Sequence, residues 1–432
     1  MDGYRWTRTT LERCGSFLSG GTPSKDHPEY WGGTIPWASA KDMKSLRLWD
    51  TVDHLTQLGA ASGAKTATEN SILVLVRGMT LHNDVPICLA KRPMAFKQDV
   101  KAIQANPGVD SQFLLYWLLA RKPSLLASVD SASHGTGRIN TEVLKNIEIL
   151  LPPWAEQRAI AHILGTLDDK IELNRRMNET LEAMARAIFK SWFVDFDPVR
   201  AKAEGRDPGR GEVVSNLFPA SFIDSDLAES PEGWSAGTLA DFARLNPESW
   251  SRTAAPEQIE YVDLANTKWG TIDSTAVYRW GKAPSRAQRV LRPGDSIVGT
   301  VRPGNGSYAF ISEEGLTGST GFAALRPRRP EFAEFVYLAA TSASNIERLA
   351  HLADGAAYPA VRPEVVLATP VPRTAGALLQ RFSRAVCPLM NKMAANTPQS
   401  RTLAALRETL LPKLISGELR VKDEKKITER MA

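Results

Sequence analysis

Two stretches of the chain carry the spacing of apolar residues that is typical of a coiled-coil helix. In the first, apolar positions separated alternately by four and three residues run from Ile160 to Trp192, which is the a and d pattern of a heptad repeat. The same pattern returns 222 residues later, from Phe382 to Leu414. Because an apolar seam must be buried, we expect two long helices that pack on each other in an antiparallel pair. The seam positions are Ile160, Leu164, Leu167, Ile171, Asn174, Leu181 and Ile188 in the first stretch, and Phe382, Val386, Leu389, Met393, Asn396, Leu403 and Leu410 in the second.

A polar break interrupts both seams at the same place. Asn174 and Asn178 in the first stretch correspond to Asn396 and Ser400 in the second. A buried asparagine in a coiled coil can fix the register and the pairing of the helices. We therefore hypothesise that Asn174 and Asn396 have this role.

The two helices should differ in their continuity. The first should run without a break from about Ala155 to about Phe193. The second contains Thr397-Pro398, which is typical of a helix N-cap followed by proline at the first helical position. We therefore expect the second helical region to be broken near Asn396.

The regions that precede the two helices also match each other. Each contains, in order, an apolar stretch that reads as a buried strand ending in a basic turn, a short apolar helix and a glycine-bearing loop. Arg77 and Arg302 occupy matching strand ends in this comparison. The internal repeat therefore extends beyond the helices. The matched ranges are 71–78 and 296–304, 113–118 and 333–338, and 134–138 and 354–358.

These patterns predict a fold of the α+β class with a mixed α/β character. It would consist of two similar globular domains separated by a long antiparallel two-helix coiled coil, related by an internal pseudo-twofold repeat. A stretch rich in Gly, Pro, Asp, Glu and Ser follows the first helix and should be a linker. The predicted parts are a first globular domain at 1–150, a central helical region at 151–199, a linker at 200–232, a second globular domain at 233–370, a C-terminal helical region at 371–421 and a charged tail at 422–432.

Composition narrows the classes of protein. The 432 residues have a formal net charge of +5, an excess that fits nucleic-acid binding without requiring it. The three cysteines, Cys14, Cys88 and Cys387, lie far apart in the sequence, which argues against a disulfide framework or a structural zinc site. We see no signal peptide and no apolar run long enough for a membrane span. The expected location is therefore the cytoplasm, with no membrane partner.

The chain also lacks the motifs of several enzymes. It contains no GxxxxGK[ST] phosphate loop, which an ATP-driven translocase would need. Residues 151–154, Leu-Pro-Pro-Trp, are near the Pro-Pro-aromatic motif of amino-methyltransferases, but a leucine replaces the polar first residue, so we interpret the segment as a strand-to-helix corner. Asp168, Asp169 and Glu172 are interpreted as a solvated helix face or a partner contact in preference to a metal or acid–base site. We therefore expect no catalytic residue and no metal site.

Several segments resemble the specificity subunits of type I restriction–modification systems. The opening Gly20-Gly21-Thr22-Pro23-Ser24 and the segment 30–37 are similar to the start of a target-recognition domain. Residues 151–174 resemble the central repeated helix of that family, and residues 406–419 resemble its C-terminal copy. Residues 234–239 resemble the entry to a second recognition domain, although the Gly-Gly-Thr-Pro-Ser opening is missing there.

This resemblance implies a non-catalytic subunit that binds double-stranded DNA. Each target-recognition domain would read one half of a bipartite target, and each helical region would dock one adenine methyltransferase subunit. Two such subunits with this chain would form an N6-adenine methyltransferase, and two added translocase–nuclease subunits would give the restriction enzyme. The chain itself would hold no cofactor, because S-adenosylmethionine, ATP and Mg²⁺ belong to the partner subunits. The alternatives are a stand-alone bipartite DNA-binding repressor and a protein-binding scaffold.

Candidate DNA contacts follow from residue type and from position in the expected loops. Basic and polar side chains bond to phosphates and to base edges, although each could equally be an ordinary solvated loop residue. Tryptophans such as Trp31 and Trp37 are interpreted as core or interface residues. The candidates are Thr22, Ser24, Lys25, Lys41, Arg77, His134 and Arg138 in the first domain, and Arg252, Lys268, Arg286, Arg289, Arg302 and Tyr358 in the second.

Overall fold

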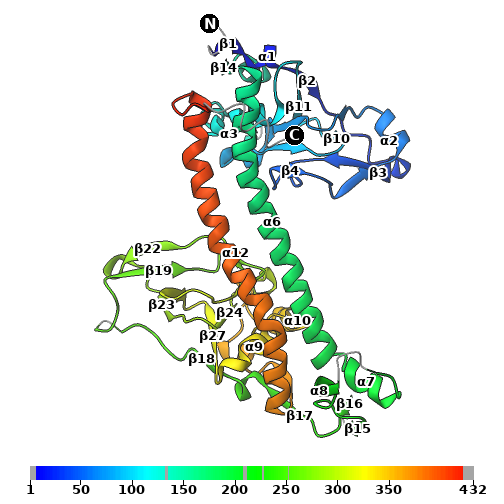
Figure 1. Ribbon diagram of the computed structural model, residues 1–432, viewed down its shortest axis with the longest axis vertical. Coiled ribbons are helices and arrows are strands. Elements are labelled where there is room, and N and C mark those ends of the chain that lie inside the picture. The colour runs from blue at the N-terminus through cyan, green and yellow to red at the C-terminus, as the bar shows by residue number, and fades with distance from the viewer. Residues whose placement is uncertain (1–5, 132–134, 208–211, 226–227, 252, 422–432) are drawn as a thin grey trace. The chain divides into compact units, whose positions relative to one another are not determined.

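A computed structural model of the chain describes residues 6–131, 135–207, 212–225, 228–251 and 253–421 (Figure 1). The chain divides into two compact units. Unit 1 combines the residues up to 172 with those from 400 onward, and unit 2 contains residues 173–399. Two long helices, α6 (Trp154–Phe193) and α12 (Gly376–Ser416), contribute residues to both units.

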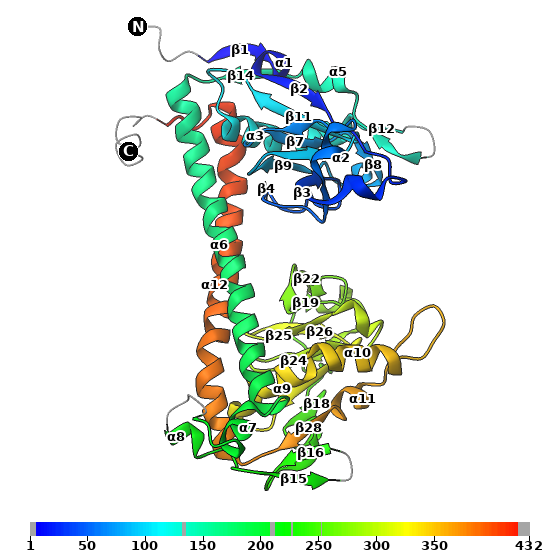
Figure 2. The same ribbon diagram turned by 90° about the vertical axis from the view of Figure 1, so that its right-hand side faces the viewer.

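Unit 1 contains a mixed domain of short strands and helices in front of α6. Its central sheet has the strand order β2-β11-β7-β9-β4, and a second sheet has the order β5-β3-β10-β6. Strands β11, β7 and β9 lie side by side in Figure 2. The elements are β1 Thr7–Thr10, α1 Leu11–Cys14, β2 Gly15–Ser19, η1 Pro28–Tyr30, β3 Trp31–Ala38, β4 Arg47–Leu48, β5 Asp53–Leu55, α2 Gln57–Ala61, β6 Thr66–Ala67, β7 Ile72–Leu75, β8 Arg77–Gly78, η2 Met79–His82, β9 Ile87–Ala90, β10 Met94–Phe96, β11 Val100–Ala105, α3 Ser111–Ala120, α4 Lys122–Ala127, β12 Asp130–Ser131, β13 Gly137–Arg138, α5 Thr141–Lys145 and β14 Glu148–Leu151.

Unit 2 contains a second domain of the same kind. Its two main sheets have the orders β18-β27-β24-β25 and β22-β19-β26-β23. The elements are α7 Asp197–Ala203, α8 Glu212–Ser215, β15 Phe222–Ser225, β16 Ala228–Pro231, β17 Ser235–Thr238, η4 Leu239–Asp241, β18 Ala243–Leu245, β19 Gln258–Val262, β20 Thr267–Lys268, β21 Thr271–Ile272, β22 Ala276–Arg279, η5 Trp280–Lys282, β23 Ala287–Val290, β24 Ser296–Gly299, η6 Pro303–Asn305, β25 Tyr308–Phe310, β26 Leu316–Ser319, β27 Phe322–Pro327, η7 Pro330–Phe332, α9 Ala333–Ala340, α10 Ala343–Leu352, α11 Pro363–Leu367 and β28 Pro370–Arg373.

The strand pairing confirms the internal repeat. The order β2-β11-β7-β9 in unit 1 corresponds strand by strand to β18-β27-β24-β25 in unit 2, and β5-β3-β10-β6 corresponds to β22-β19-β26-β23. The one parallel pair of the smaller sheet, β3 with β10, is matched by β19 with β26. Strands β1 and β14 pair antiparallel, as do β17 and β28. Both domains are therefore copies of one mixed α/β scaffold, as the sequence predicted.

A buried helix covers the central sheet of each domain. In unit 1 this helix is α3, which begins where the side chain of Asp110 accepts hydrogen bonds from the backbone amides of Gln112 and Phe113, an N-cap interaction. Phe113 and Trp117 are fully buried against the sheet and against α6. In unit 2, α9 occupies the corresponding place, and its Phe335 packs on the rings of Phe189 and Phe193 of α6.

The helices α6 and α12 pair antiparallel in each unit. In unit 1, Arg407 of α12 binds Asp168 of α6, and in unit 2, Asn396 of α12 binds Asn178 of α6. As the residue number rises along one helix, it falls along the other. The predicted seam residues are all buried or half-buried in the helix pair.

The expected break in the second helix is wrong. Helix α12 continues without interruption from Gly376 to Ser416. Thr397 does not cap a new helix, because its hydroxyl donates to the carbonyl of Met393 one turn back. A proline removes one backbone hydrogen bond, but seam residues lie on both sides of Pro398, with Asn396 buried and Leu403 half-buried. This packing stabilises the continuous helix.

The segment after α6 is also more structured than the predicted linker. It forms the short helices α7 and α8 and the hairpin β15–β16. Val199 and Phe218 of this segment are buried in the core of unit 2. The indole of Trp192 in α6 packs edge-on against the ring of Phe218. The polar composition of this segment suggested a linker because it contains few apolar residues, although these few are buried in the core.

Candidate nucleic-acid interface

Two of the predicted arginines lie beside each other at the end of the central sheet of unit 1. Strand β8 pairs antiparallel with β13, and this register places Arg77 directly opposite Arg138. Both side chains are exposed. The main chain continues this contact, because the amide of Ile139 donates to the carbonyl of Val76 at 2.9 Å. The two guanidinium groups therefore project from a rigid backbone, as a pair of phosphate or base contacts requires.

More positive charge gathers next to Arg138. Burial lowers the pKa of Lys101 in β11, and three nearby cations lower it further. These cations are Lys145, Arg138 and Lys65. Lys101 also donates a hydrogen bond to the hydroxyl of Ser19. Because like charges held together repel, an anion at this surface would be stabilised.

Sequence reasoning missed Lys65 and Lys101. Neither lies in one of the loops that suggested the other candidates. Lys101 is the only charged residue of strand β11, and this was the one local signal that could have singled it out. Its neighbours along the cluster come from other parts of the sequence, so only the fold brings them together.

The loop before η1 presents the first group of candidates. The indole of Trp37 donates to the carbonyl of Gly21 at 3.0 Å, and that of Trp31 donates to the carbonyl of Ser24 at 3.2 Å. The ammonium of Lys25 lies 5.9 Å from the centre of the Trp31 ring. Ser24 and Lys25 are exposed. The tryptophans thus act as supports for the loop, which leaves its polar side chains accessible.

Two of the remaining candidates of the first domain already have side-chain partners within the domain. The hydroxyl of Thr22 donates to the side-chain carbonyl of Gln98. The ammonium of Lys41 lies 2.8 Å from the carboxylate of Asp53, and this hydrogen bond raises the pKa of Lys41. Because the carboxylate of Asp53 offsets its charge, Lys41 adds less net positive charge to this surface than Arg77 does. His134 lies outside the described residues.

Arg302 and Tyr358 form an exposed pair in unit 2. Arg302 has the left-handed backbone conformation, with φ of 47°. Its guanidinium donates to the carbonyl of Ala357 at 2.8 Å and lies 4.6 Å from the centre of the Tyr358 ring. The side chain of Tyr358 is 70% exposed. A guanidinium stacked on a tyrosine gives a flat, cationic surface, which suits contacts with bases or phosphates.

The other candidates of unit 2 are spread over its smaller sheets. Arg286 is exposed just before β23, and Lys268 is exposed on β20. Arg289 is half-buried on β23, where its guanidinium donates to the hydroxyl of Ser249 at 3.3 Å. Burial lowers the pKa of Arg289. Arg252 lies outside the described residues.

The two domains place different side chains at the same position of the scaffold. The pairing of Arg77 with Arg138 in unit 1 corresponds to the isolated bridge of Val301 with Ala360 in unit 2. The hydrogen-bonding pattern therefore corrects the sequence comparison by one residue, since Arg77 corresponds to Val301 and not to Arg302. Equivalent backbone with unlike side chains is what two recognition surfaces for different targets would need.

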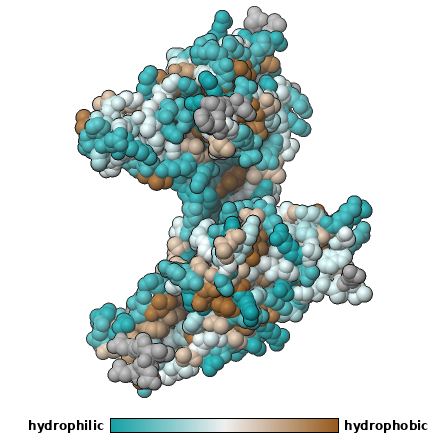
Figure 3. Space-filling view, turned by 180° about the vertical axis from the view of Figure 1, so that it is seen from behind, coloured by the Kyte–Doolittle hydropathy of each residue, from teal (hydrophilic) through white to brown (hydrophobic). Residues whose placement is uncertain are grey.

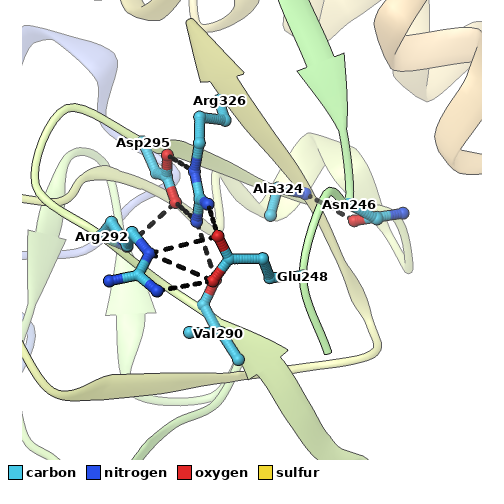
Figure 4. A network of polar contacts seen from close by, with 7 residues as sticks. All are labelled: Asn246, Glu248, Val290, Arg292, Asp295, Ala324 and Arg326. Carbon is cyan, nitrogen blue, oxygen red and sulfur yellow. Dashed lines mark hydrogen bonds and ion pairs between the residues drawn. The ribbon is translucent and has the colours of Figure 1, made fainter. Parts of the chain in front are cut away.

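A charged network braces the second domain near its candidate surface (Figure 4). Arg326 of β27 binds Asp295 at 2.9 Å and also contacts Glu248 at 2.5 Å. Arg292 binds Glu248 at 2.8 Å. The hydrogen bond from Arg292, and then that from Arg326, holds the pKa of Glu248 below its usual value, although burial acts in the opposite direction. The network ties the loop after β18 to strands β24 and β27.

Unit 1 fixes the corresponding loop by close backbone approach. A Cβ on Gly20 would lie 2.2 Å from the carbonyl oxygen of Phe96, and one on Gly21 would lie 2.1 Å from that of Gly63. Only glycine fits at such distances. The corresponding loop of the second domain has no such glycine pair, and the ion pairs of Glu248 tie it to the sheet.

We also searched the described residues for a membrane-spanning helix and for a metal site. The face of each unit seen in Figure 3 is largely hydrophilic, with small hydrophobic patches. Among the described residues, no helix is long and apolar enough to cross a membrane. Within the same residues, no group of three or more His, Cys, Asp or Glu side chains is arranged to hold a metal ion.

Comparison with known proteins shows what the chain is similar to. Residues 6–183 match the model of the type I restriction modification DNA specificity domain. The chain is 25% identical to the specificity subunit of the type I restriction enzyme MjaIX of Methanocaldococcus jannaschii, over 97% of this chain and 94% of that one. Nearly the whole chain is therefore similar to a type I specificity subunit, and its first domain matches the family model. The chain is also 24% identical to the HindI specificity subunit of Haemophilus influenzae, over 67% of this chain and 73% of that one.

A solved structure shows the same fold. A crystal structure of a type I restriction–modification S subunit from M. genitalium matches 96% of this chain and 97% of its own, with a TM-score of 0.59 and 17% identity. At this identity the match supports the fold alone. It agrees with the repeated α/β domains and the paired helices described above.

The acidic cluster on α6 is a set of structural contacts. The carboxylate of Asp168 accepts hydrogen bonds from the hydroxyl of Tyr116 at 2.7 Å and from the guanidinium of Arg407 at 2.6 Å. Burial, and then the negative charge of Asp168, raises the pKa of Tyr116. Asp169 forms an ion pair with Arg47. The cluster therefore joins the domain to both helices, and Asp168 is not the solvated residue that we expected.

The Leu-Pro-Pro-Trp segment is a corner between β14 and α6, as the sequence predicted. The buried side chain of Gln157 donates to the carbonyls of Pro152 at 2.9 Å and Gly108 at 3.2 Å. It also accepts a hydrogen bond from the amide of Asp110 at 2.8 Å. This residue fixes the start of α6 against the start of α3, which is a positioning role in the specificity subunit scaffold.

Proposed function

We propose that this chain reads a bipartite DNA target, with one half-site bound by the domain of unit 1 and the other by the domain of unit 2. The observation that carries the proposal is the repeat itself. Two copies of one scaffold present Arg77 and Arg138 in unit 1, but Val301 and Ala360 at the same positions in unit 2. Copies with the same residues there would favour a symmetric target, whereas unlike residues favour two different half-sites.

The candidate surfaces have the chemistry of DNA contacts. In unit 1, Arg77, Arg138 and Lys101 concentrate positive charge, which binds phosphates and releases counterions. In unit 2, Arg302 and Tyr358 offer a guanidinium stacked on an exposed ring. Arginine is also the side chain most suited to guanine in the major groove. Within this proposal these residues supply both affinity and part of the specificity.

The proposal assigns the helices to partner binding. Helices α6 and α12 carry exposed apolar side chains that no domain covers, with Leu173 51%, Met184 48% and Leu406 45% exposed. Exposed apolar residues on a helix favour contact with another protein. Two repeats imply two copies of an adenine methyltransferase subunit, which would bring S-adenosylmethionine. Two translocase–nuclease subunits, with ATP and Mg²⁺, would complete a restriction enzyme.

A binding experiment separates this proposal from its alternatives. Three samples are prepared: the purified chain, an adenine methyltransferase subunit encoded next to it in the genome, and both proteins together. Each is titrated with a duplex that carries the sequence methylated by the pair and with a random duplex. The proposal predicts weak binding by the chain alone and tight, selective binding by the complex. Tight selective binding by the chain alone would instead favour a stand-alone repressor. Loss of any preference for the motif duplex in the complex would favour a protein-binding scaffold.

A further inference from the structure

Unit 1 contains a pocket of about 360 Å³ between its central sheet and helix α6. Its walls come from the edge strand β4, from the residue after β9, from α3 and from the first half of α6. The pocket is open to the surface, and most of its lining is polar. The side chains that give it its character are Arg47, Trp49, Lys91, Gln112, His162 and Thr166.

The pocket holds more positive than negative charge. Arg47 and Lys91 supply two permanent cations, and Asp169 supplies one carboxylate. Arg47 is largely buried and is ion-paired with Asp169, whose side chain is 58% exposed. Lys91 lies 5.8 Å from the centre of the Trp49 ring and donates to the side-chain carbonyl of Asn70 at 3.1 Å. Lys91 has no carboxylate partner among the ion pairs of the described residues, so its charge is available to an incoming anion.

The location separates this pocket from the candidate DNA surface. Arg77 and Arg138 lie on β8 and β13, and Figure 2 shows β8 and β12 on the side of the unit 1 domain away from α6. The exposed carboxylate of Asp169 at the pocket would repel a phosphate backbone. A protein partner can place one carboxylate next to Lys91 and keep its other groups clear of Asp169. These features favour a protein ligand.

The second domain also has an exposed tryptophan near this edge of its central sheet, but at a different position in the register. In unit 1, Trp49 follows β4, which pairs with β9 at the edge of the central sheet. In unit 2, Trp269 lies at the turn between β20 and β21, which contacts β25, the strand that corresponds to β9. The two side chains are 49% and 57% exposed.

We propose that the pocket of unit 1 receives an acidic side chain of the methyltransferase subunit, with the carboxylate bound by Lys91 and Arg47 and the rest of the contact packed on Trp49. This inference rests on the proposed function, because it adds a specific anchor to the docking of that subunit. Aromatic and cationic side chains at the edge of a pocket are typical anchors of protein interfaces. A charge pair at this open pocket would also make assembly depend on salt.

The test uses Lys91→Glu and Trp49→Ala in the full chain, mixed with its methyltransferase subunit. Both variants should bind the subunit roughly tenfold or more weakly than the unchanged chain. Lys91→Arg should keep most of the affinity, because it retains the charge. Unfolding midpoints of the variants, measured in parallel, show whether the fold is intact. If Lys91→Glu folds and binds the subunit with unchanged affinity, the pocket is not a docking site.

Lys25 and Trp31 offer a matched control, because they form a similar cation–aromatic contact at 5.9 Å on the candidate DNA surface. Lys25→Glu should leave assembly unchanged and weaken DNA binding by the assembled complex. Lys91→Glu should weaken assembly. Once excess methyltransferase subunit has driven assembly to completion, the Lys91→Glu complex should bind DNA with unchanged affinity. If Lys91→Glu weakens DNA binding and not assembly, the pocket faces DNA and the inference is wrong. If the unchanged chain does not bind the methyltransferase at all, the proposed function fails instead.

Discussion

The side-chain amide of Asn396 donates a hydrogen bond to the side-chain carbonyl of Asn178 at 2.8 Å, from one long helix to the other. A second polar contact lies beside it, where Asn174 donates to Gln399 at 2.9 Å. Both contacts interrupt an otherwise apolar seam within unit 2. Asn174 and Asn396 are the two asparagines that we singled out from the sequence. Each binds a different residue on the opposite helix, which is consistent with the hypothesis that they fix its register.

Replacing one partner of this contact should cost more than replacing both. Asn396→Leu removes the donor and leaves the side-chain carbonyl oxygen of Asn178 facing an apolar group, so we expect a loss of about 1–3 kcal/mol in the free energy of unfolding. The double variant Asn178→Leu with Asn396→Leu should recover much of that loss, since two leucines suit the seam. Urea unfolding of the two single variants and the double variant measures this as a double-mutant cycle. Additive losses would show that the two residues are not coupled.

Asp168 should be important for the stability of unit 1. Asp168→Asn removes the charge that binds Arg407 and alters the hydrogen bond from Tyr116, so we expect a loss of about 1–3 kcal/mol. Glu408→Gln is a suitable control, because Glu408 is 72% exposed and lies 3.6 Å from Arg407. Exposed pairs contribute little, and this control should unfold like the unchanged chain. An equal effect of both variants in urea unfolding would contradict the assigned role of Asp168.

The network around Glu248 predicts a dependence of stability on pH. Its pKa in the folded chain lies below the ordinary value of 4.5, with Arg292 as the largest cause. The stabilisation is therefore fully present above pH 4.5 and is lost as the pH falls below it. Glu248→Gln should cost on the order of 1 kcal/mol at neutral pH, because this pair is partly exposed and screened. The difference between this variant and the unchanged chain should shrink during acid titration; a constant difference would argue against the ion pairs.

Arg138 should contribute to DNA affinity through phosphate contacts. Arg138→Ala should weaken binding by the assembled complex and reduce the slope of log affinity against log salt by about 1. Lys41→Ala is the matched control, because the charge of Lys41 is paired with Asp53, and it should have a smaller effect. Binding titrations at several salt concentrations check both variants. An unchanged salt slope for Arg138→Ala would remove this residue from the proposed interface.

Local patterns predicted the helices well, because heptad spacing depends on residues that are near each other in sequence. Helix α6 spans Trp154–Phe193, close to the predicted bounds. The order of the strands could not be predicted, since β3 and β10 pair across a long stretch of chain. The effect of Pro398 was also misjudged, because tertiary packing around the seam outweighs a local helix-breaking signal.

The arrangement of the candidate DNA contacts was harder to predict from the sequence than the fold. Arg77 and Arg138 were both proposed as single loop residues, but only the pairing of β8 with β13 shows that they are neighbours. Lys101 was missed because a lysine in a strand carries no sign of the cations that surround it. The alignment of Arg77 with Arg302 was wrong by one position. It matched two identical residues, whereas the hydrogen-bond register, which only the structure reveals, matches Arg77 with Val301.

The most direct test of the central claim is a genome-wide map of N6-methyladenine. Cells that express this chain with its neighbouring methyltransferase are compared with cells that express the methyltransferase alone. The proposed function predicts a split motif, with two different halves and a fixed spacer, that is methylated only when this chain is present. Identical maps in both cells would contradict it, because the chain would then not choose the sequence on which the methyltransferase acts.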